Sequence, residues 1–164
     1  MERHQREELL AVWLEAHRGL VLKVVLAYAE EAEREDLFQE IWLTLWLAID
    51  GHVETAKPST FIYRVALNRA MNWRRTRRRY RARVATWERL PVWGEDPRER
   101  EELETLYAAI HQLEPLDRAL VLLWLDQLSY REMAEIHGLS ESSVGARLSR
   151  AREKLATLLE EDNT

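Results

Sequence analysis

The residues with the clearest chemistry form a run of arginines. The range Arg74–Arg83 holds seven arginines and no acidic residue, in a chain of formal net charge −5 at pH 7. Guanidinium groups bind phosphate, and a basic block on an acidic chain indicates contact with a polyanion. The preceding segment adds aromatic rings, which stack on unpaired bases, at Phe61, Tyr63 and Trp73. We predict a nucleic-acid contact here, against the alternative of a solvated charged tail.

The rest of the chain offers no catalytic or metal-binding constellation. Cysteine is absent, which excludes disulfides and thiolate chemistry. No metal-ligand spacing exists among the five histidines, which are His4, His17, His52, His111 and His137. There is also no glycine-rich phosphate loop. We predict a protein that is not an enzyme and that binds no cofactor and no metal.

Composition favours an all-α fold. The chain has 164 residues with only five glycines and four prolines, whereas short strands joined by tight turns need more of both. No uncharged apolar run is long enough for a transmembrane helix, and the first residues lack a signal-peptide core. We expect a soluble cytoplasmic protein without membrane insertion.

Apolar periodicity predicts the helices of the first domain. A pattern from Leu9 to Tyr28 indicates one bent helix or two short helices on either side of Gly19. The clearest stripe has helical spacing and consists of Phe38, Ile41, Trp42, Leu45, Trp46 and Ile49. Gly51 is expected to end that helix. Another helix is predicted from Pro58 to about Arg79.

The polar face of the stripe helix lies opposite its tryptophans. Its members are Asp36, Gln39, Glu40 and Leu43. Spacing alone does not distinguish a protein partner from solvent for this face.

A change in composition separates the two halves of the chain. Prolines and a glycine interrupt the pattern within residues 82–102, which we predict to be a flexible linker. The expected architecture is two small helical domains, residues 1–81 and 103–164. The second domain is expected to begin near Glu101 and to include a helix over Leu116–Leu128.

Residues 130–152 have the pattern of a helix-turn-helix. Ser129 and Glu132 form a capping-box sequence, Gly138 is placed for the turn, and Ser140 is placed to cap the last helix. Ala134 is the small residue that a steep helix crossing needs, and Val144 is placed to pack back onto it. A plain helical hairpin is the alternative, but the arginines near its end favour DNA binding.

The outward face of the second helix carries small groups. A helical wheel buries Val144, Leu148, Ala151 and Leu155. It exposes Ser142, Gly145, Ala146 and Ser149, with Arg147 and Arg150 on the flanks. This set favours phosphate contacts over direct base readout. Gly145 in mid-helix indicates either a close approach by DNA or protein, or drift.

Three segments together resemble bacterial RNA polymerase sigma factors of the extracytoplasmic-function (ECF) group. The first, from Asp36, reads DLFQEIWLTLW and is similar to that family's region 2.2. The second, from Thr60, reads TFIYRVALNRAMNWRR. The third, from Leu128, reads LSYREMAEIHGLSESSVGARLSRAREKL and is similar to region 4.2. The resemblance covers about residues 5–80 and 103–160.

This resemblance implies an alternative sigma factor that binds core RNA polymerase, directs it to specific promoters and helps melt the minus-ten region. The β′ clamp helices are expected to meet Asp36, Gln39, Glu40 and Leu43. Minus-ten DNA is expected to meet Lys57, Ser59, Thr60, Phe61, Arg64, Asn68, Asn72, Arg74 and Arg75. Minus-thirty-five DNA is expected to meet Ser142, Ser143, Gly145, Ala146, Arg147, Ser149 and Arg150.

Further partners follow from the same resemblance. The loop from His52 to Thr60 is expected to capture a flipped base, and the linker to thread toward the active-centre cleft. The β flap is expected to face Leu120, Val121 and Trp124. An anti-sigma factor is the expected regulator, although no segment of the sequence identifies one.

Departures from the family pattern keep two alternatives open. Phe61 stands for the usual Trp and Asn72 for the usual Asp, and Gly145-Ala146 replaces a basic residue followed by Ser. The last change predicts weak dependence on the minus-thirty-five element. One alternative is a stand-alone helix-turn-helix regulator, which would need to dimerise on a palindromic site. The other is a degenerate sigma-like protein that sequesters a partner.

Overall fold

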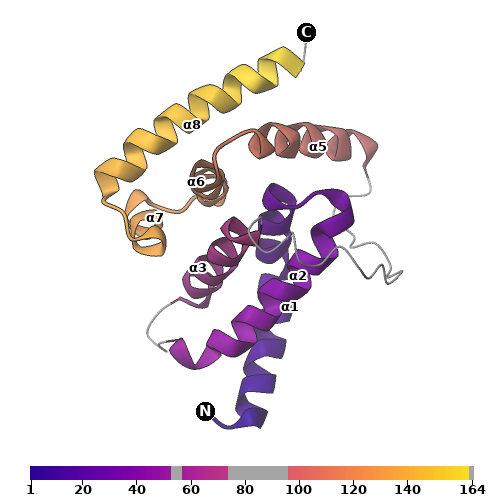
Figure 1. Cartoon of the computed structure of the whole chain (residues 1–164), viewed down its shortest axis with the longest axis vertical. Coiled ribbons are helices and arrows are strands. Elements are labelled where there is room, and N and C mark those ends of the chain that lie inside the picture. Colours follow the sequence, from indigo (N-terminus) through magenta and orange to yellow (C-terminus); the bar gives the residue numbers. More distant parts are fainter. Residues whose placement is uncertain (53–56, 74–95, 163–164) are drawn as a thin grey trace. The chain divides into compact units, whose positions relative to one another are not determined.

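The structure is a computed structural model that describes residues 1–52, 57–73 and 96–162 (Figure 1). Every regular element within these ranges is a helix, which confirms the all-α prediction. The chain divides into two compact units, Met1–Leu90 and Pro91–Thr164. Each unit has its own core.

In the described part of the first unit, three helices each pack against the other two. Its helices are α1 (Arg3–Tyr28), α2 (Arg34–Ala48) and α3 (Pro58–Met71). Short 3₁₀ turns, η1 (Glu31–Glu33) and η2 (Ile49–Gly51), precede and follow α2. The largest fully buried side chains of this unit are Val21, Leu37, Ile41, Leu45, Ile49, Ile62 and Leu67.

Helix α1 is a single continuous helix, which decides between the two predicted arrangements. Gly19 lies inside it, and a Cβ there would meet nothing within 4 Å. A mid-helix glycine costs about 1 kcal/mol relative to alanine. Burial of Val21, Val24 and Val25 in the following turns holds the helix together across it.

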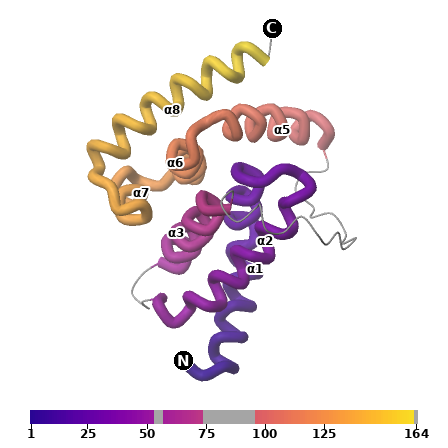
Figure 2. Tube along the Cα trace, viewed as in Figure 1, coloured from indigo at the N-terminus to yellow at the C-terminus, as the bar shows by residue number. Residues whose placement is uncertain are grey.

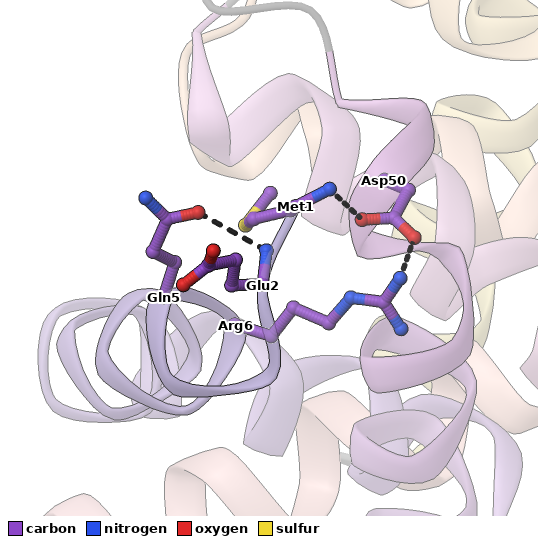
Figure 3. Close-up of polar contacts among 5 residues, drawn as sticks. All are labelled: Met1, Glu2, Gln5, Arg6 and Asp50. Atoms are coloured by element: carbon purple, nitrogen blue, oxygen red, sulfur yellow. Dashed lines mark hydrogen bonds and ion pairs between the residues drawn. The ribbon is translucent and has the colours of Figure 1, made fainter.

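The start of α1 is tied to the turn that follows α2 (Figure 3). The Arg6 guanidinium pairs with the Asp50 carboxylate in η2. The Met1 ammonium lies 3.8 Å from the other oxygen of the same carboxylate. The Glu2 N–H donates to Gln5 Oε1 at 3.1 Å, which satisfies one of the free donors at the helix start. These contacts fix two segments that lie far apart in the sequence.

The predicted stripe of α2 faces the core. Five of its six members are buried: Phe38, Ile41, Trp42, Leu45 and Ile49. Trp46 is half-buried. The α-helix ends at Ala48 and its 3₁₀ extension ends at Gly51, where the sequence predicted the stop. The opposite face of α2 is therefore left outward.

Helix α3 begins at Pro58, as predicted, because proline is favoured in the first turn. It ends at Met71, whereas the sequence predicted a helix to about Arg79. The arginine run from Arg74, most of the predicted linker and the tip of the predicted base-capture loop lie outside the described residues.

The second unit is built around its last helix, which packs against the other three. Its helices are α5 (Pro97–His111), α6 (Pro115–Leu125), α7 (Tyr130–His137) and α8 (Glu141–Asp162). Buried Arg118 donates from Nε to the Leu113 carbonyl at 2.8 Å and from Nη2 to the His111 carbonyl. These bonds hold the turn between α5 and α6.

Two predicted boundaries in this half were wrong. Helix α5 starts at Pro97, inside the predicted linker, because the Asp96 side chain accepts from the Arg98 N–H at 2.9 Å. Asp-Pro is a helix-start signal as well as a loop signal. Helix α6 ends at Leu125 rather than Leu128, and Gln127 adopts a left-handed φ of 62° in the turn that follows.

Candidate protein and nucleic-acid interfaces

The outward face of α2 combines polar groups with exposed leucines. Asp36 and Gln39 are exposed, as predicted for a surface site. Leu43 is 53% exposed, and Leu47, one helical turn later, is 74% exposed. Sequence analysis missed Leu47, although its spacing of four from Leu43 places both on one face. An apolar pair beside acidic groups suits a partner helix better than solvent.

Glu40 is already engaged within the first unit. Its Oε2 accepts from Arg69 of α3, at 3.0 Å from Nη2 and 3.3 Å from Nε. The Arg69 guanidinium also lies over the Trp73 ring, 5.5 Å from its centroid. The structure assigns it to α2, where it orients Glu40 on the outward face.

Burial corrects the predicted stacking residues of α3. Phe61 and Tyr63 are only 6% and 3% exposed. The Phe61 ring packs against Trp13 and His52, with centroids 5.7 and 5.3 Å away, and Arg64 covers it at 5.7 Å. Neither ring is available to stack on a base in this structure. Both residues lie on the face of α3 that packs into the core, and type alone could not reveal this.

The remaining predicted minus-ten residues lie at the surface where they are described. Four are exposed: Lys57, Arg64, Asn68 and Asn72. Ser59 and Thr60 are half-buried in the first turn of α3. Arg74 and Arg75 lie outside the described residues. The exposed side chains of α3 and of the residues that flank it form one polar and basic strip.

The helix-turn-helix is confirmed in its local detail (Figure 2). Ser129 and Glu132 form the predicted capping box, with bonds of 3.1 and 2.8 Å. Gly138 ends α7 with a φ of 66°, a conformation that favours glycine. Ser140 Oγ accepts from the Ser143 N–H at 3.1 Å and caps α8. The turn chemistry therefore sets how α7 passes into α8.

Helix α8 presents the face that the wheel predicted. Its buried residues are Val144, Leu148, Ala151 and Leu155. Its exposed predicted DNA residues are Ser142, Ser143, Ala146, Ser149 and Arg150. The exposed group is small or hydroxylated apart from one arginine. It offers few side chains that reach base edges.

Gly145 has a structural reason. A Cβ at this position would lie 3.3 Å from Cε2 of Tyr130, whose ring belongs to the first turn of α7. The glycine thus makes room for an aromatic ring from the neighbouring helix. Tyr130 itself is 42% exposed, so this ring is part of the same outward surface.

Arg147, which was predicted to flank the DNA-facing surface, is instead paired with an acidic residue of the same unit. Its Nη2 lies 3.0 Å, and its Nε 3.1 Å, from Oδ1 of Asp117 in the first turn of α6. The pair joins positions 30 residues apart, so neither sequence segment indicates it by itself.

The predicted flap-facing set is also corrected. Leu120 and Val121 are fully buried in the core of the second unit. Trp124 is half-buried, and the Arg152 guanidinium covers its ring at 4.3 Å from the centroid. Leu125, at 42% exposed, is the most exposed large apolar side chain of α6.

Comparison with known proteins identifies the family of both units. Residues 13–80 match the model of sigma-70 region 2, and residues 103–155 match that of sigma-70, region 4. The chain belongs to the sigma-70 family. The two models confirm that the motifs resemble sigma factors because they are sigma-70 regions.

Curated relatives of this sigma-family chain include the ECF RNA polymerase sigma factor SigG of two Mycobacterium tuberculosis strains. Each is 30% identical over an alignment of 155 residues, which covers 77% of this chain and 42% of the relative. The chain thus spans less than half the length of these relatives.

Two solved structures share the fold. The sigma factor RpoE of Bartonella quintana, in complex with the anti-sigma factor NepR, gives a TM-score of 0.66 at 20% identity and covers 94% of this chain and 96% of that one. CnrH, in complex with the cytosolic domain of CnrY, gives a TM-score of 0.66 at 23% identity and covers 95% of this chain and 90% of that one.

Two other features are absent from the described residues. None of the helices there has the length and apolar character needed to cross a membrane. Within the same ranges, no group of three or more potential ligands could hold a metal ion.

Proposed function

We propose that this chain is an alternative sigma factor that binds core RNA polymerase in the cytoplasm, directs it to specific promoters and helps melt the minus-ten region. The observation that carries the proposal is the presence of both sigma-70 regions in one chain, each folded around its own core. A stand-alone regulator would leave the first of these units without a role.

In this proposal the outward face of α2 binds the β′ clamp helices. Asp36, Gln39 and Leu43 are exposed there, and Arg69 holds Glu40 in one orientation. Leu47 extends the face by one turn with the most exposed large apolar side chain in the described part of the chain. The leucines supply the apolar centre of the contact and the acidic groups supply charge complementarity.

The exposed strip of α3 is proposed to hold the minus-ten strand. Lys57, Arg64, Asn68 and Asn72 carry donors that reach phosphates and base edges. Arg74 and Arg75 are proposed to continue the contact, which should make DNA binding depend on salt. Since Phe61 and Tyr63 are buried, base capture falls to the loop before α3.

The outward face of α8 is proposed to enter the major groove of the minus-thirty-five element. Its serines, Ala146 and Arg150 are exposed, so phosphate contacts and close backbone approach dominate over base readout. This supports a weak dependence on that element. The proposed regulator is an anti-sigma factor, because RpoE, which shares this fold, was solved in complex with the anti-sigma factor NepR.

Transcription with purified core polymerase on a library of promoter fragments tests the proposal. Specific new start sites that require this chain are the expected result. Co-elution with core without initiation would support a sequestering protein instead. If the chain neither supports initiation nor co-elutes with core polymerase, the proposal is wrong. The stand-alone helix-turn-helix regulator is then the better interpretation.

A further inference from the structure

The two α8 arginines that were predicted to meet DNA have different surroundings. Arg147 directs two of its donors, Nε and Nη2, at one oxygen of Asp117. Arg150, three residues later, is exposed, and no ion partner faces it within the described ranges. A guanidinium has five donors in a fixed fork, so an ion pair that uses one edge restricts where the others can point.

The Asp117–Arg147 pair is partly withdrawn from solvent. The side chains are 22% and 36% exposed, respectively. Such a pair is screened by salt less than a fully exposed one. Asp117 also lies in the first turn of α6, where the helix dipole favours an acidic side chain. The Asp117 carboxylate is therefore held in place beside α8.

We infer that Asp117 competes with DNA phosphate for Arg147 and keeps this arginine from contributing to DNA affinity. The inference rests on the proposed function of α8 as the DNA-facing helix. A phosphate that takes Arg147 must displace Asp117 and leave a carboxylate unpaired beside a second negative charge. Arg150 bears no such cost, so it is the arginine that supplies the phosphate contact.

Binding of the full chain to a fluorescently labelled duplex of random sequence tests this inference. Anisotropy titrations between about 50 and about 200 mM salt give both the Kd and the slope of log Kd against log salt. The variants are Asp117→Asn, Arg147→Gln, Arg150→Gln and the double variant Asp117→Asn with Arg147→Gln. Glu153→Gln on the exposed side of α8 is the control for the loss of one negative charge.

The expected results separate the two arginines. Arg150→Gln weakens binding and lowers the magnitude of the salt slope by about 0.9, the value for one phosphate contact. Arg147→Gln changes Kd by less than about twofold, as for a group that makes no contact. Asp117→Asn tightens binding several-fold and raises the magnitude of the slope by about 0.9, and Arg147→Gln abolishes that gain.

Three results would overturn the inference. The first is that Arg147→Gln weakens DNA binding as much as Arg150→Gln does. The second is that the gain in DNA affinity from Asp117→Asn persists in the double variant. The third is that Glu153→Gln produces the same gain in DNA affinity. An Arg150→Gln variant with unchanged binding would instead contradict the DNA-facing role of α8, which is a failure of the proposed function. Far-UV circular dichroism melts identify any unfolded variant. Because one substitution removes the acidic partner and another removes the basic partner, the pair is tested even if one variant fails to fold.

Discussion

His137 occupies the last turn of α7, directly before the left-handed glycine that ends the helix. Burial lowers the pKa of this imidazole from its ordinary 6.5. Its Nε2 atom is buried and has no hydrogen-bond partner among the described residues. A proton added there would place a charge in surroundings that cannot solvate it, so the folded chain binds that proton less readily than the unfolded chain.

The free energy of unfolding is expected to fall as the pH falls from about 6.5 through the lower pKa of folded His137. Over that window the unfolded state binds more protons, so stability rises with pH and is lost on acidification. His137→Gln should flatten this dependence in urea melts at several pH values.

A further histidine serves as a comparison for that experiment. Burial also lowers the pKa of His17 in α1, so His17→Gln should remove a separate part of the slope. An unaltered pH dependence in His137→Gln would contradict the burial argument.

Helices α7 and α8 pack against each other where the Tyr130 ring of α7 lies over Gly145 of α8. Tyr130 Cε2 lies 3.3 Å from where a Gly145 Cβ would be, a distance that forces the ring to move by a few tenths of an ångström. Glycine in a helix interior costs about 1 kcal/mol relative to alanine, so this contact opposes an otherwise favourable substitution.

Gly145→Ala is expected to raise the free energy of unfolding by less than about 1 kcal/mol in the native background. With Tyr130→Ala as the background, the same substitution should give the full gain of about 1 kcal/mol, since no ring opposes the methyl group. Urea melts of the native chain, Gly145→Ala, Tyr130→Ala and the double variant form a double-mutant cycle. Equal gains in both backgrounds would show that the ring moves without cost.

The outward face of α2 can be tested apart from stability because its leucines are exposed. Leu47→Glu should change the free energy of unfolding by no more than about 0.5 kcal/mol, as surface substitutions do. It should weaken binding to core polymerase by at least about tenfold if Leu47 lies at the centre of the contact. Val12→Glu on α1, at a residue 60% exposed, is the matched control. Equal polymerase binding by the native chain, Leu47→Glu and Val12→Glu would show that the polymerase contact lies elsewhere.

Local signals were enough to predict most of these helices. The stripe of α2, the capping box at Ser129 and Glu132, and the turn at Gly138 involve residues within a few turns of one another. Their geometry follows from helical periodicity and backbone preference. The start of α5 at Pro97 was missed because the same Asp-Pro sequence occurs in loops and at helix starts.

Across the whole chain, two units carry different parts of the proposed function. The first unit provides the polymerase-facing α2 and the polar strip of α3, and the second provides the helix-turn-helix. The side chains that could read bases are sparse on α8. Promoter choice should therefore depend more on the minus-ten region than on the upstream element.

Replacing the minus-thirty-five sequence of a responsive promoter should lower initiation by less than about tenfold, the effect of a single lost base-specific contact. Replacing the minus-ten sequence should lower initiation much further. Run-off transcription on the matched promoter variants, with a footprint of each, measures both effects. Strong, sequence-selective protection of the upstream element would contradict this prediction.

The sequence by itself determined the helical class, the order of the motifs and most of the residues that face outward on α2 and α8, because these depend on composition and local periodicity. Only the tertiary structure decided which functional side chains are available. Phe61 is buried, Glu40 is held by Arg69, and Arg147 is held by Asp117. These outcomes depend on helices that are distant in sequence and adjacent in the fold, and residue type and spacing carry no information about such neighbours.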